Sequence, residues 1–599
     1  MTDTVELGNL ASGAALTADG RYLWTVSAGF GANDVRIVDT TTRQVCQVIP
    51  VAGASGGIAL DTPHGLAYVA GLLYSRWRPT EKSLPAAAGN SILVYRWTDT
   101  CGQAALDRVI PVPPPADAPV VQQFPPSSPG STAPGTTNAW PQQVAVTPDG
   151  TRLLVALNLA DRAAVVDLGH GDAVTYVQTG DGGYPYGAAI TPDGKTGLVT
   201  NEASGEMTLI DLAAGKPLGE IAVGPPLSHP EGVIVDAAGL RAYVTLTSSD
   251  LVAVVDLAAR KVERTISVGR PAGLGTQPLA ATLDTTGTRL FVAESGAAEL
   301  AVIRVPAPDA TTPAADDWQV IGRIPTGQTP KAVLSTRSAS GAAEHLIWVS
   351  ARGVNVGPNS TGPNPTDPDD PIFWAFNPIA PTTDVFDGST TYLPSLVRGL
   401  AGFLDLPSDA ALAALTRAAD ASKDPSAVAV APADTPLRAD GPIQHVFFIV
   451  RENRSYDQLL GDLGRGNGDP SLSVFPAKVT PNLHALVTRF PLLDNVLANS
   501  EASIEGHFWT AAGAVPDYVD RNWVQQYAGR LRPNDFGTYA VSWPGNGFLF
   551  NQAERQGITY FNYGEGFDGG DPSIPDRNRS DADEARVAAV AANSILAPA

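Results

Sequence analysis

At 599 residues the chain is too long for one ordinary hydrophobic core, so two or more domains are expected. Hydrophobic residues make up 44% of it and charged residues 17%, which excludes an intrinsically disordered protein. The 61 acidic residues outnumber the 39 basic ones, which argues against a nucleic-acid partner or an anionic membrane surface. We expect this negative charge to keep a large protein soluble.

The chain starts with MTDTVELGNLASG, which lacks the basic stretch and apolar stretch of a signal peptide. No run of about 18 apolar residues follows anywhere, so we expect no transmembrane segment. An export signal upstream of this sequence remains open.

Two cysteines, Cys46 and Cys101, each come shortly before an Ile-Pro-Val segment. They would suit one bridge between neighbouring repeats, and they would equally suit two separate buried thiols.

A repeated pattern occupies the first four hundred residues. VAVTPDGTRLLVALNLADRAAVVDL, AAITPDGKTGLVTNEASGEMTLIDL and VIVDAAGLRAYVTLTSSDLVAVVDL align with a period of 43 to 45 residues. Their turn aspartates are Asp149, Asp193 and Asp236, and their strand-ending aspartates are Asp167, Asp211 and Asp256. Further copies lie around Asp19 and Asp39, around Asp284, and more degenerately in 57–110 and 328–405.

Each copy reads as three strands with Pro-Asp-Gly turns, closed by a fourth strand such as PLGEIAVG or KVERTISVG. Four short strands per repeat predict the blade of a β-propeller, and the copies predict seven blades. The segments resemble the YVTN-type propeller repeat over residues 1–407. Propellers usually present a binding face, so a protein or surface ligand is expected there.

Two insertions, 112–141 and 356–371, are rich in Pro, Ser, Thr and Gly and are expected to be surface loops. The propeller histidines His64, His170, His229 and His345 are scattered, and we interpret them as surface or core residues. Residues 408–441 are interpreted as a linker, with a helix in 408–424 and a Pro-containing tether after it.

A new pattern begins in 442–599. The apolar run HVFFIV (445–450) predicts a strand buried on both faces of an α/β sheet, and Ser455 with Gln458 predicts a capping box for a short helix. Glu452 and Asn453 would then lie at the carboxyl end of that strand, where open α/β sheets bind ligands. A carboxylate with an amide oxygen suits a divalent cation, whereas the alternative is that both residues cap the helix.

The stretch 490–519 reads as a second strand, a loop and a helix that starts near Ser503. A hydroxyl at a helix N-terminus is well placed to attack phosphorus, and His507 lies one turn further on the same side. The alternative is that Ser503 caps the helix while His507 packs beside Trp509.

The motifs ENRSYD, TPNLHAL, LLDN, SEASIEGHFW and GITYFNYGEG occur in order between about 443 and 566. Together they resemble the bacterial phosphoesterase family of phospholipases C and acid phosphatases, in the alkaline phosphatase superfamily. Propeller and phosphoesterase also occur together in a family of fused proteins. The resemblance implies a multidomain protein: an all-β propeller followed by an alkaline-phosphatase-like α/β domain.

The resemblance also implies metal-dependent hydrolysis of phosphoric esters, either small molecules or phospholipids. Glu452 and Asn453 would be metal ligands, Ser503 the nucleophile and His507 a residue lining the site. The divalent ion could be Zn, Ca, Mg or Mn, and the family suggests export to the periplasm or the exterior.

The family completes its site with later Asp and His residues. After GITYFNYGEGFD this chain contains no histidine, and only three core strands are predicted in 443–599: HVFFIV, FPLLDNVLA and GITYFNY. We therefore expect an incomplete domain. The alternative function is a propeller binding protein whose phosphoesterase domain is inactive. An oxidoreductase propeller with a quinone cofactor lacks the cluster of His, Arg and carboxylates that it would need.

Overall fold

The computed structural model describes residues 3–30, 33–72, 90–98, 100–118, 138–270, 275–307, 317–337, 344–354, 394, 397–423, 435–436, 441–528, 530, 537, 539–563 and 565. Most of both predicted insertions, of the predicted tether and of the Asp-rich stretch after 566 lies outside these residues.

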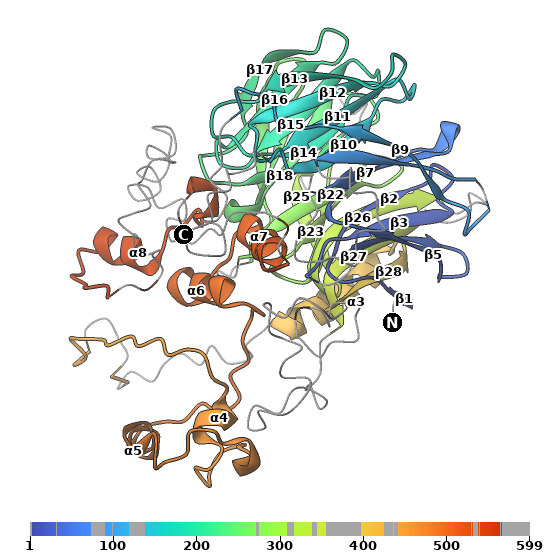
Figure 1. Cartoon of the computed structure of the whole chain (residues 1–599). Coiled ribbons are helices and arrows are strands. Elements are labelled where there is room, and N and C mark those ends of the chain that lie inside the picture. Colours follow the sequence, from blue (N-terminus) through green and yellow to red (C-terminus); the bar gives the residue numbers. More distant parts are fainter. Residues whose placement is uncertain are drawn as a thin grey trace.

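Seven four-stranded antiparallel sheets form a ring, which makes the N-terminal part a seven-bladed β-propeller (Figure 1). The innermost strands contact one another around the ring; they are β2 (Ala11–Leu16), β6 (Ala54–Asp61), β10 (Pro141–Val146), β14 (Pro185–Ile190), β18 (Pro230–Val235), β22 (Pro278–Leu283) and β26 (Gln328–Arg337). The second strands are β3 (Tyr22–Ser27), β7 (Leu66–Gly71), β11 (Arg152–Leu157), β15 (Thr196–Asn201), β19 (Arg241–Leu246), β23 (Arg289–Glu294) and β27 (Glu344–Val354). The third strands are β4 (Asn33–Asp39), β8 (Ser91–Arg96), β12 (Arg162–Asp167), β16 (Glu206–Asp211), β20 (Leu251–Asp256), β24 (Glu299–Arg304) and β28 (Arg398–Asp405).

The outermost strands are β5 (Gln44–Val51), β9 (Ala105–Pro111), β13 (Ala173–Gln178), β17 (Lys216–Ala222), β21 (Lys261–Ser267), β25 (Gln319–Pro325) and β1 (Asp3–Glu6). We number the blades 1 to 7 from β2 onward. The N-terminal strand β1 is thus the outer strand of blade 7, where Thr4 pairs with Gly402 and Val5 with Ala401. This pairing joins the two ends of the ring, and the predicted propeller with seven blades is confirmed.

The blades pack face to face. Second and third strands such as β11 and β12 are buried almost throughout, because both faces of each blade meet a neighbouring blade. One core cluster joins Tyr68 and Ile92 of blade 2 to Leu153 and Val155 of blade 3. The outer strand β17 is exposed except for Ile221, which explains why its sequence is the more polar. Apolar runs on the inner strands therefore follow from burial on two faces.

The repeated aspartates shape the turns. Asp149 accepts hydrogen bonds from the hydroxyl of Thr147 and from the backbone N–H of Thr151. These bonds lower the pKa of Asp149 to about 2. Asp211 likewise accepts from the backbone N–H groups of Ala213 and Ala214. The recurring aspartates are consequently structural, and they explain why the repeat is visible in the sequence.

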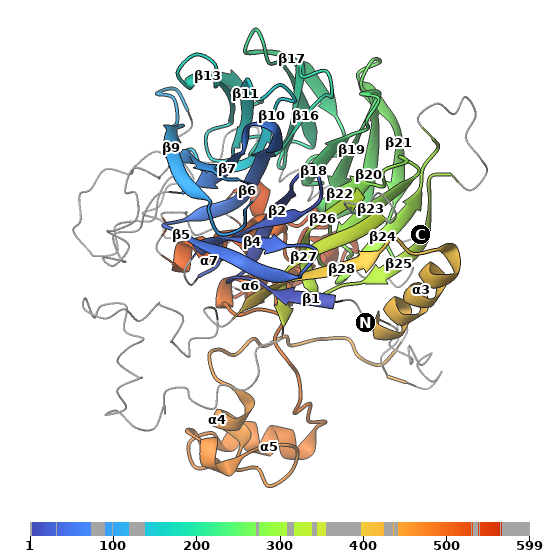
Figure 2. The ribbon, with the colours of Figure 1, turned by 90° about the vertical axis from the view of Figure 1, so that its right-hand side faces the viewer.

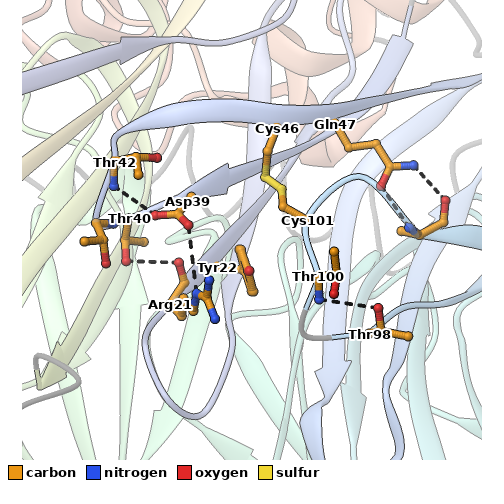
Figure 3. Close-up of a disulfide and its surroundings, with 12 residues drawn as sticks. Arg21, Tyr22, Asp39, Thr40, Thr42, Cys46, Gln47, Thr98, Thr100 and Cys101 are labelled. Carbon is orange, nitrogen blue, oxygen red and sulfur yellow. Dashed lines mark hydrogen bonds and ion pairs between the residues drawn. A yellow bond between two sulfur atoms is a disulfide. The ribbon is translucent and has the colours of Figure 1, made fainter.

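A disulfide joins Cys46 on β5 of blade 1 to Cys101 in the turn before β9 of blade 2 (Figure 3). The two Cα atoms are 5.8 Å apart, as disulfides require. Beside it, Gln47 exchanges two hydrogen bonds with the backbone of Ala104. Of the two interpretations of the cysteines, the bridge between neighbouring repeats is therefore confirmed.

The helix predicted in 408–424 is α3 (Asp409–Lys423), and it lies against the outer strand β25 of blade 6 (Figure 2). Leu412 packs in the same core cluster as Ile324, and Thr416 accepts a hydrogen bond from the backbone N–H of Arg323. Arg270 pairs with Asp420. The predicted helix therefore packs on blade 6, and the interpretation of 408–441 as a linker between domains stays a prediction.

Beyond residue 441 the described residues form helices and extended segments. The helices are α4 (Tyr456–Leu460), η5 (Pro470–Leu472), α5 (Pro481–Arg489), α6 (Ser503–Ala512), α7 (Asp517–Tyr527), η6 (Ala540–Ser542) and α8 (Leu549–Arg555). The capping box of Ser455 and Gln458 on α4 is confirmed. In Figure 1, α6 and α7 lie against the propeller, whereas α4 and α5 form a lobe apart from it. No helix in the described part of the chain is long and apolar enough to cross a membrane.

The three predicted core strands of the C-terminal domain are wrong for the described residues, in which no strand follows β28. HVFFIV is extended and unpaired, with Phe447 89% exposed. Leu497 is 86% exposed and Tyr563 94% exposed in the other two segments. A strand needs a hydrogen-bonded neighbour as well as apolar side chains, and these segments have none. An alkaline-phosphatase-like sheet is not shown.

We predict that losing the Cys46–Cys101 bridge destabilises the propeller. The bridge closes a loop with a sequence separation of 55 residues. Its removal should therefore cost up to about 3–4 kcal/mol through the added freedom of the unfolded chain. Thermal unfolding of the chain with and without a thiol reductant measures this effect. The double variant Cys46→Ala/Cys101→Ala should show a low melting temperature that reductant no longer changes; equal melting temperatures for all samples would contradict the prediction.

Candidate functional site

Five of the seven innermost strands begin at a repeated three-residue segment, which we call a hub triplet. The hub triplets are 140–142, 184–186, 229–231, 277–279 and 329–331, each with proline in the middle. The residue before the proline has a positive φ in every case, from 50° at Trp140 to 54° at Tyr184 and Thr329. Proline disfavours helical φ/ψ in the preceding residue, and a positive φ is rare outside glycine, so a strained turn recurs around the ring.

The hub triplets present side chains to residues 500–548, which we call the cap segment. The cap segment contains α6, α7 and η6 and lies over one face of the ring, at the ends of the innermost strands (Figure 1). Trp140 and Tyr184 share a core cluster with Phe508, Tyr518 and other apolar residues of the cap segment. The first residues of the triplets therefore form the seat of the cap.

Hydrogen bonds anchor the cap segment to blades around the ring. Gln277 donates to the backbone oxygen of Val515 at 2.7 Å, and Nε2 of His229 donates to that of Val541 at 2.9 Å. On the opposite part of the ring, Arg530 is fully buried and donates to the carbonyl oxygens of Gly29 and Ala52. The cap is thus fixed at several points, far apart in the sequence.

A buried network of charged side chains lies between α7 and the centre of the ring. Asp520 accepts a hydrogen bond from Lys331 and another from Arg352, each at 2.7 Å. Arg521 bonds both carboxylate oxygens of Glu202 at 2.6 Å and reaches Asp517 at 2.5 Å. Lys331 also donates to Asp517. Charges this deeply buried are stable only when paired, so α7 and the blades specify one another.

The pKa values of the carboxylates in the network depend on which cations they pair with. Burial alone would raise the pKa of Asp520, but the charges of Arg352 and Lys331 outweigh it and hold that pKa well below its usual range. Glu505 is buried too, with Arg352 as its nearest cation, and burial raises its pKa to about 8. The network therefore holds the ionised carboxylate of Asp520 close to that of Glu505, whose pKa lies near neutral pH.

His229 is fully buried and belongs to this seat, whereas we interpreted it as one of several scattered histidines. Its Nδ1 lies 2.5 Å from the hydroxyl of Ser248, opposite the bond from Nε2 to the cap. Burial lowers its pKa to about 4, with the nearby charge of Arg521 acting in the same direction. The imidazole is therefore neutral at pH 7, and its role is structural docking of the cap.

The residues predicted to form a phosphoesterase site lie on the outer side of the cap and beside it. Glu452 and Asn453 are exposed in the extended segment before α4. Ser503 is the first residue of α6 and is exposed, while Ala502 is the N-cap, so the alternative that Ser503 caps the helix is wrong. His507, one turn on, holds Glu565 by a 2.8 Å contact through Nδ1.

Glu452 and the start of α6 approach the same end of α7. Burial and the charge of Glu452 raise the pKa of Tyr527, so Glu452 lies within electrostatic range of that tyrosine. Ile504, next to Ser503, packs with Val524 and Ala528. In the described part of the chain, no hydrogen bond or ion pair joins Glu452 or Asn453 to Ser503 or His507. The structure thus brings the four predicted residues to one region without direct contact between the two pairs.

The surroundings of Glu452 and Asn453 do not complete a metal site in the described residues. Among the residues that the structure describes, the one group of three His, Cys, Asp or Glu ligands within common reach is elsewhere, at Glu202, Glu231 and Asp517. Catalytic metal centres usually take three protein ligands, and Glu452 and Asn453 supply two oxygens. Whether a metal binds there stays a prediction.

Sequence reasoning missed Glu565 and the charged residues of the network. Glu565 follows the predicted GITYFNY segment and carried no spacing signal. The hub triplets did carry one, because AWPQ, GYPY, SHPE, TQPL and QTPK recur at the start of the repeat. A bulky or polar residue followed by proline at the start of five of the innermost strands would have pointed to the ring centre.

No protein-family model matches the chain, and no curated protein matches it. Solved structures that resemble it include hydrazine synthase from Kuenenia stuttgartiensis, with 17% identity and a TM-score of 0.40 over 56% of this chain and 92% of that chain. Virginiamycin B lyase from Staphylococcus aureus has 12% identity and a TM-score of 0.39 over 58% of this chain and 95% of that chain. At such identities and TM-scores these likenesses carry no argument about activity; the propeller assignment rests on the strand pairing described above.

We predict that Asp520→Ala releases the cap. The substitution leaves Lys331 and Arg352 buried without their shared partner, which should cost roughly 3–5 kcal/mol. Unfolding in denaturant measures the loss, and limited proteolysis should cut the cap segment faster. Lys195→Ala is the control, because the side chain of Lys195 is 81% exposed in its pair with Asp193 and should contribute under about 0.5 kcal/mol. Similar stability of the two variants would contradict the role given to Asp520.

We also predict that docking of the cap weakens as pH falls from about 6.5 to 4. The pKa of His229 is about 4 when buried, and an exposed histidine has a pKa of about 6.5. The undocked state therefore takes up the proton first, and stability present above pH 6.5 is lost as the pH falls toward 4, by up to about 3 kcal/mol. The measurement is the difference in unfolding free energy between the wild type and His229→Gln at each pH, in which contributions common to both, such as that of Glu505, cancel. This difference should shrink toward pH 4; a constant difference would show that His229 does not titrate in this way.

Proposed function

We propose that the chain is a phosphoesterase whose propeller serves as the platform for the catalytic helix α6. The observation that carries the proposal is the arrangement of Ser503, His507 and Glu565. Ser503 is exposed at the helix N-terminus, and His507 follows at i+4 with Glu565 on its ring. The ordered motifs between about 443 and 566 support the same assignment through their resemblance to the phosphoesterase family.

The N-terminus of α6 favours a phosphate group beside Ser503. The first N–H groups of a helix lack partners within the helix and carry partial positive charge, which suits an anionic ester and the charge that develops during its cleavage. Ser503 is exposed and makes no side-chain hydrogen bond to any residue that the structure describes, so its hydroxyl is available. Glu505 in the same turn is fully buried and bonds Ser500, which turns its carboxylate away from this surface.

His507 would transfer the proton that the reaction moves from Ser503 to the departing alcohol. Glu565 accepts from Nδ1, and Thr510 donates to the same carboxylate oxygen at 3.0 Å. A carboxylate on Nδ1 fixes the tautomer and makes Nε2 the nitrogen that can accept a proton, as in other nucleophile–histidine–carboxylate sites. In the reaction the Ser503 oxygen bonds to phosphorus while the bond from phosphorus to the ester oxygen breaks, and the departing alcohol takes a proton. Water then cleaves the phosphoserine and releases phosphate.

A second candidate function is a propeller binding protein with an inactive C-terminal part. The observation that favours it is the two-ligand set at Glu452 and Asn453, together with the three unpaired apolar segments. In that case the ligand would bind the propeller, on surface that the cap segment leaves uncovered.

We also propose that the chain works in the periplasm or outside the cell. The disulfide supports this location, because such bonds persist in oxidising compartments and are rare in the cytosol.

The test is turnover of chromogenic phosphate monoesters and diesters by the purified chain, with a panel of divalent metals and with chelator. Ser503→Ala should abolish turnover, and Glu565→Gln should lower it by roughly a hundredfold through the lost orientation of His507. Ser471→Ala is the matched control, an exposed serine in the lobe apart from the propeller, and should keep full activity. Turnover that survives Ser503→Ala would overturn the assignment of the nucleophile. Absence of turnover from folded protein with every metal would favour the binding-protein alternative.

A further inference from the structure

Glu231 is a buried carboxylate that accepts no hydrogen bond from the described residues. It is the last residue of the hub triplet 229–231 on β18, and it is fully buried. Among the described residues, neither of its carboxylate oxygens has a hydrogen-bond partner. Burial raises the pKa of Glu231 well above its usual range, and the charges of Asp517 and Glu202 add to this. A buried acid without any partner is costly and calls for a physical reason.

Two other carboxylates lie beside it. Glu202 follows β15 of blade 4, and Asp517 is the first residue of α7 in the cap segment. One oxygen from each of Glu202, Glu231 and Asp517 lies within 4.8 Å of the other two, and all three residues are buried. The three side chains come from two blades and from the cap, so the cluster spans the joint between them.

The nearby cations do not neutralise the cluster. Arg521 binds Glu202 and Asp517 but forms no hydrogen bond or salt bridge to Glu231 in the described residues. Lys331 is shared between Asp517 and Asp520. In the connected network the acidic side chains are Glu202, Glu231, Glu501, Glu505, Asp517 and Asp520, and the basic ones are Lys331, Arg352 and Arg521. The network therefore has more acidic than basic groups, and Glu231 is the acidic group in it that no cation contacts in the described residues.

The ligand set selects the class of ion. All donors are carboxylate oxygens, which suit hard divalent cations rather than thiophilic metals. Oε2 of Glu202 already accepts from both Arg521 and Asn158, but Oε1 accepts from Arg521 alone. The two oxygens of Asp517 accept one bond each, from Lys331 and from Arg521. Since a carboxylate oxygen has two lone pairs, these three oxygens can keep their bonds while they contact an ion. Ca²⁺ binds oxygen at about 2.3–2.6 Å and can bridge oxygens up to roughly 5 Å apart, whereas Mg²⁺ needs a tighter octahedron. Because Ca²⁺ tolerates irregular oxygen ligand sets better than Mg²⁺ does, we take Ca²⁺ as the ion to test.

We propose that Glu202, Glu231 and Asp517 bind one Ca²⁺-like divalent cation, and that this ion fastens the cap segment to blades 4 and 5. The site is separate from Glu452 and Asn453 and does not depend on phosphoesterase activity. Ion binding would link docking of the cap to the supply of divalent cation, because Asp517 reaches the blades only when α7 is docked. Removal of the ion would weaken the joint without altering the blades.

The experiment is a titration of the metal-stripped full-length chain with Ca²⁺ by calorimetry, together with its melting temperature and its rate of proteolysis in the cap segment. The wild type should bind one Ca²⁺ at this site, melt at a higher temperature and lose the proteolytic cut. Glu231→Gln keeps the shape of the side chain and removes its charge. It should bind Ca²⁺ at least about tenfold more weakly and show little of either effect.

Two control variants show whether a Ca²⁺ response belongs to this cluster or to another acidic group. Glu294→Gln changes another fully buried glutamate, paired with Arg323 in blade 6, and should leave the Ca²⁺ response intact. Glu452→Ala removes the predicted phosphoesterase ligand and should also leave it intact, so failure of one proposal is distinguished from failure of the other. An unchanged Ca²⁺ response in Glu231→Gln would overturn the site. Should that variant not fold, the wild type decides: no Ca²⁺ binding and no shift in melting temperature would mean that Glu231 is simply a protonated buried acid.

Discussion

The pairing of Asp520 with Lys331 and Arg352 is the constraint on which the arrangement of the two halves depends. Each of these charges loses its water when α7 docks, and only the partner on the other side repays that loss. Apolar contacts around Tyr518 add buried apolar surface between the cap segment and the blades. Such contacts tolerate small displacements of α7, whereas paired buried charges do not. The network therefore fixes the position of α7, and through α7 the position of α6.

This constraint gives the propeller a role beyond display of a binding face. The cap segment covers the ends of the innermost strands, and the surface that carries Ser503 and His507 faces away from them. Blades that pack rigidly on one another make a stiff support, and sites held on stiff supports keep their geometry. The proposed catalytic residues thus depend on the blades through α7, which holds α6 in place.

The parts of the structure that sequence could predict are those specified by neighbouring residues. Asp149 and Thr147 make a turn within a few positions, and four strands per repeat pair with their neighbours in order. The same holds for α3 and for the capping box at Ser455. Such elements need no knowledge of the rest of the chain, and seven copies of one local pattern define the ring.

The parts that could not be predicted depend on distant partners. His229 and Val541 are separated by 312 residues, and Lys331 and Asp520 by 189, so no local window joins them. HVFFIV shows the converse error, because its apolar pattern suits a buried strand but its sequence says nothing of the neighbours that a strand requires. A sequence pattern therefore predicts the conformation of a segment more readily than the segments against which it packs.

The five hub triplets separate the architecture of the ring from its chemistry. The side chains of His229, Gln277 and Lys331 bond the cap segment, whereas the cores of the blades are built mainly from the second and third strands. Substitutions at these triplet positions can consequently alter what docks on the ring while the strand pairing of the blades stays as it is. The hub triplets thus occupy equivalent positions around the ring, and each can carry different side chains. A different cap segment, or a different ion, would require substitutions in these five triplets and not in the rest of the blades.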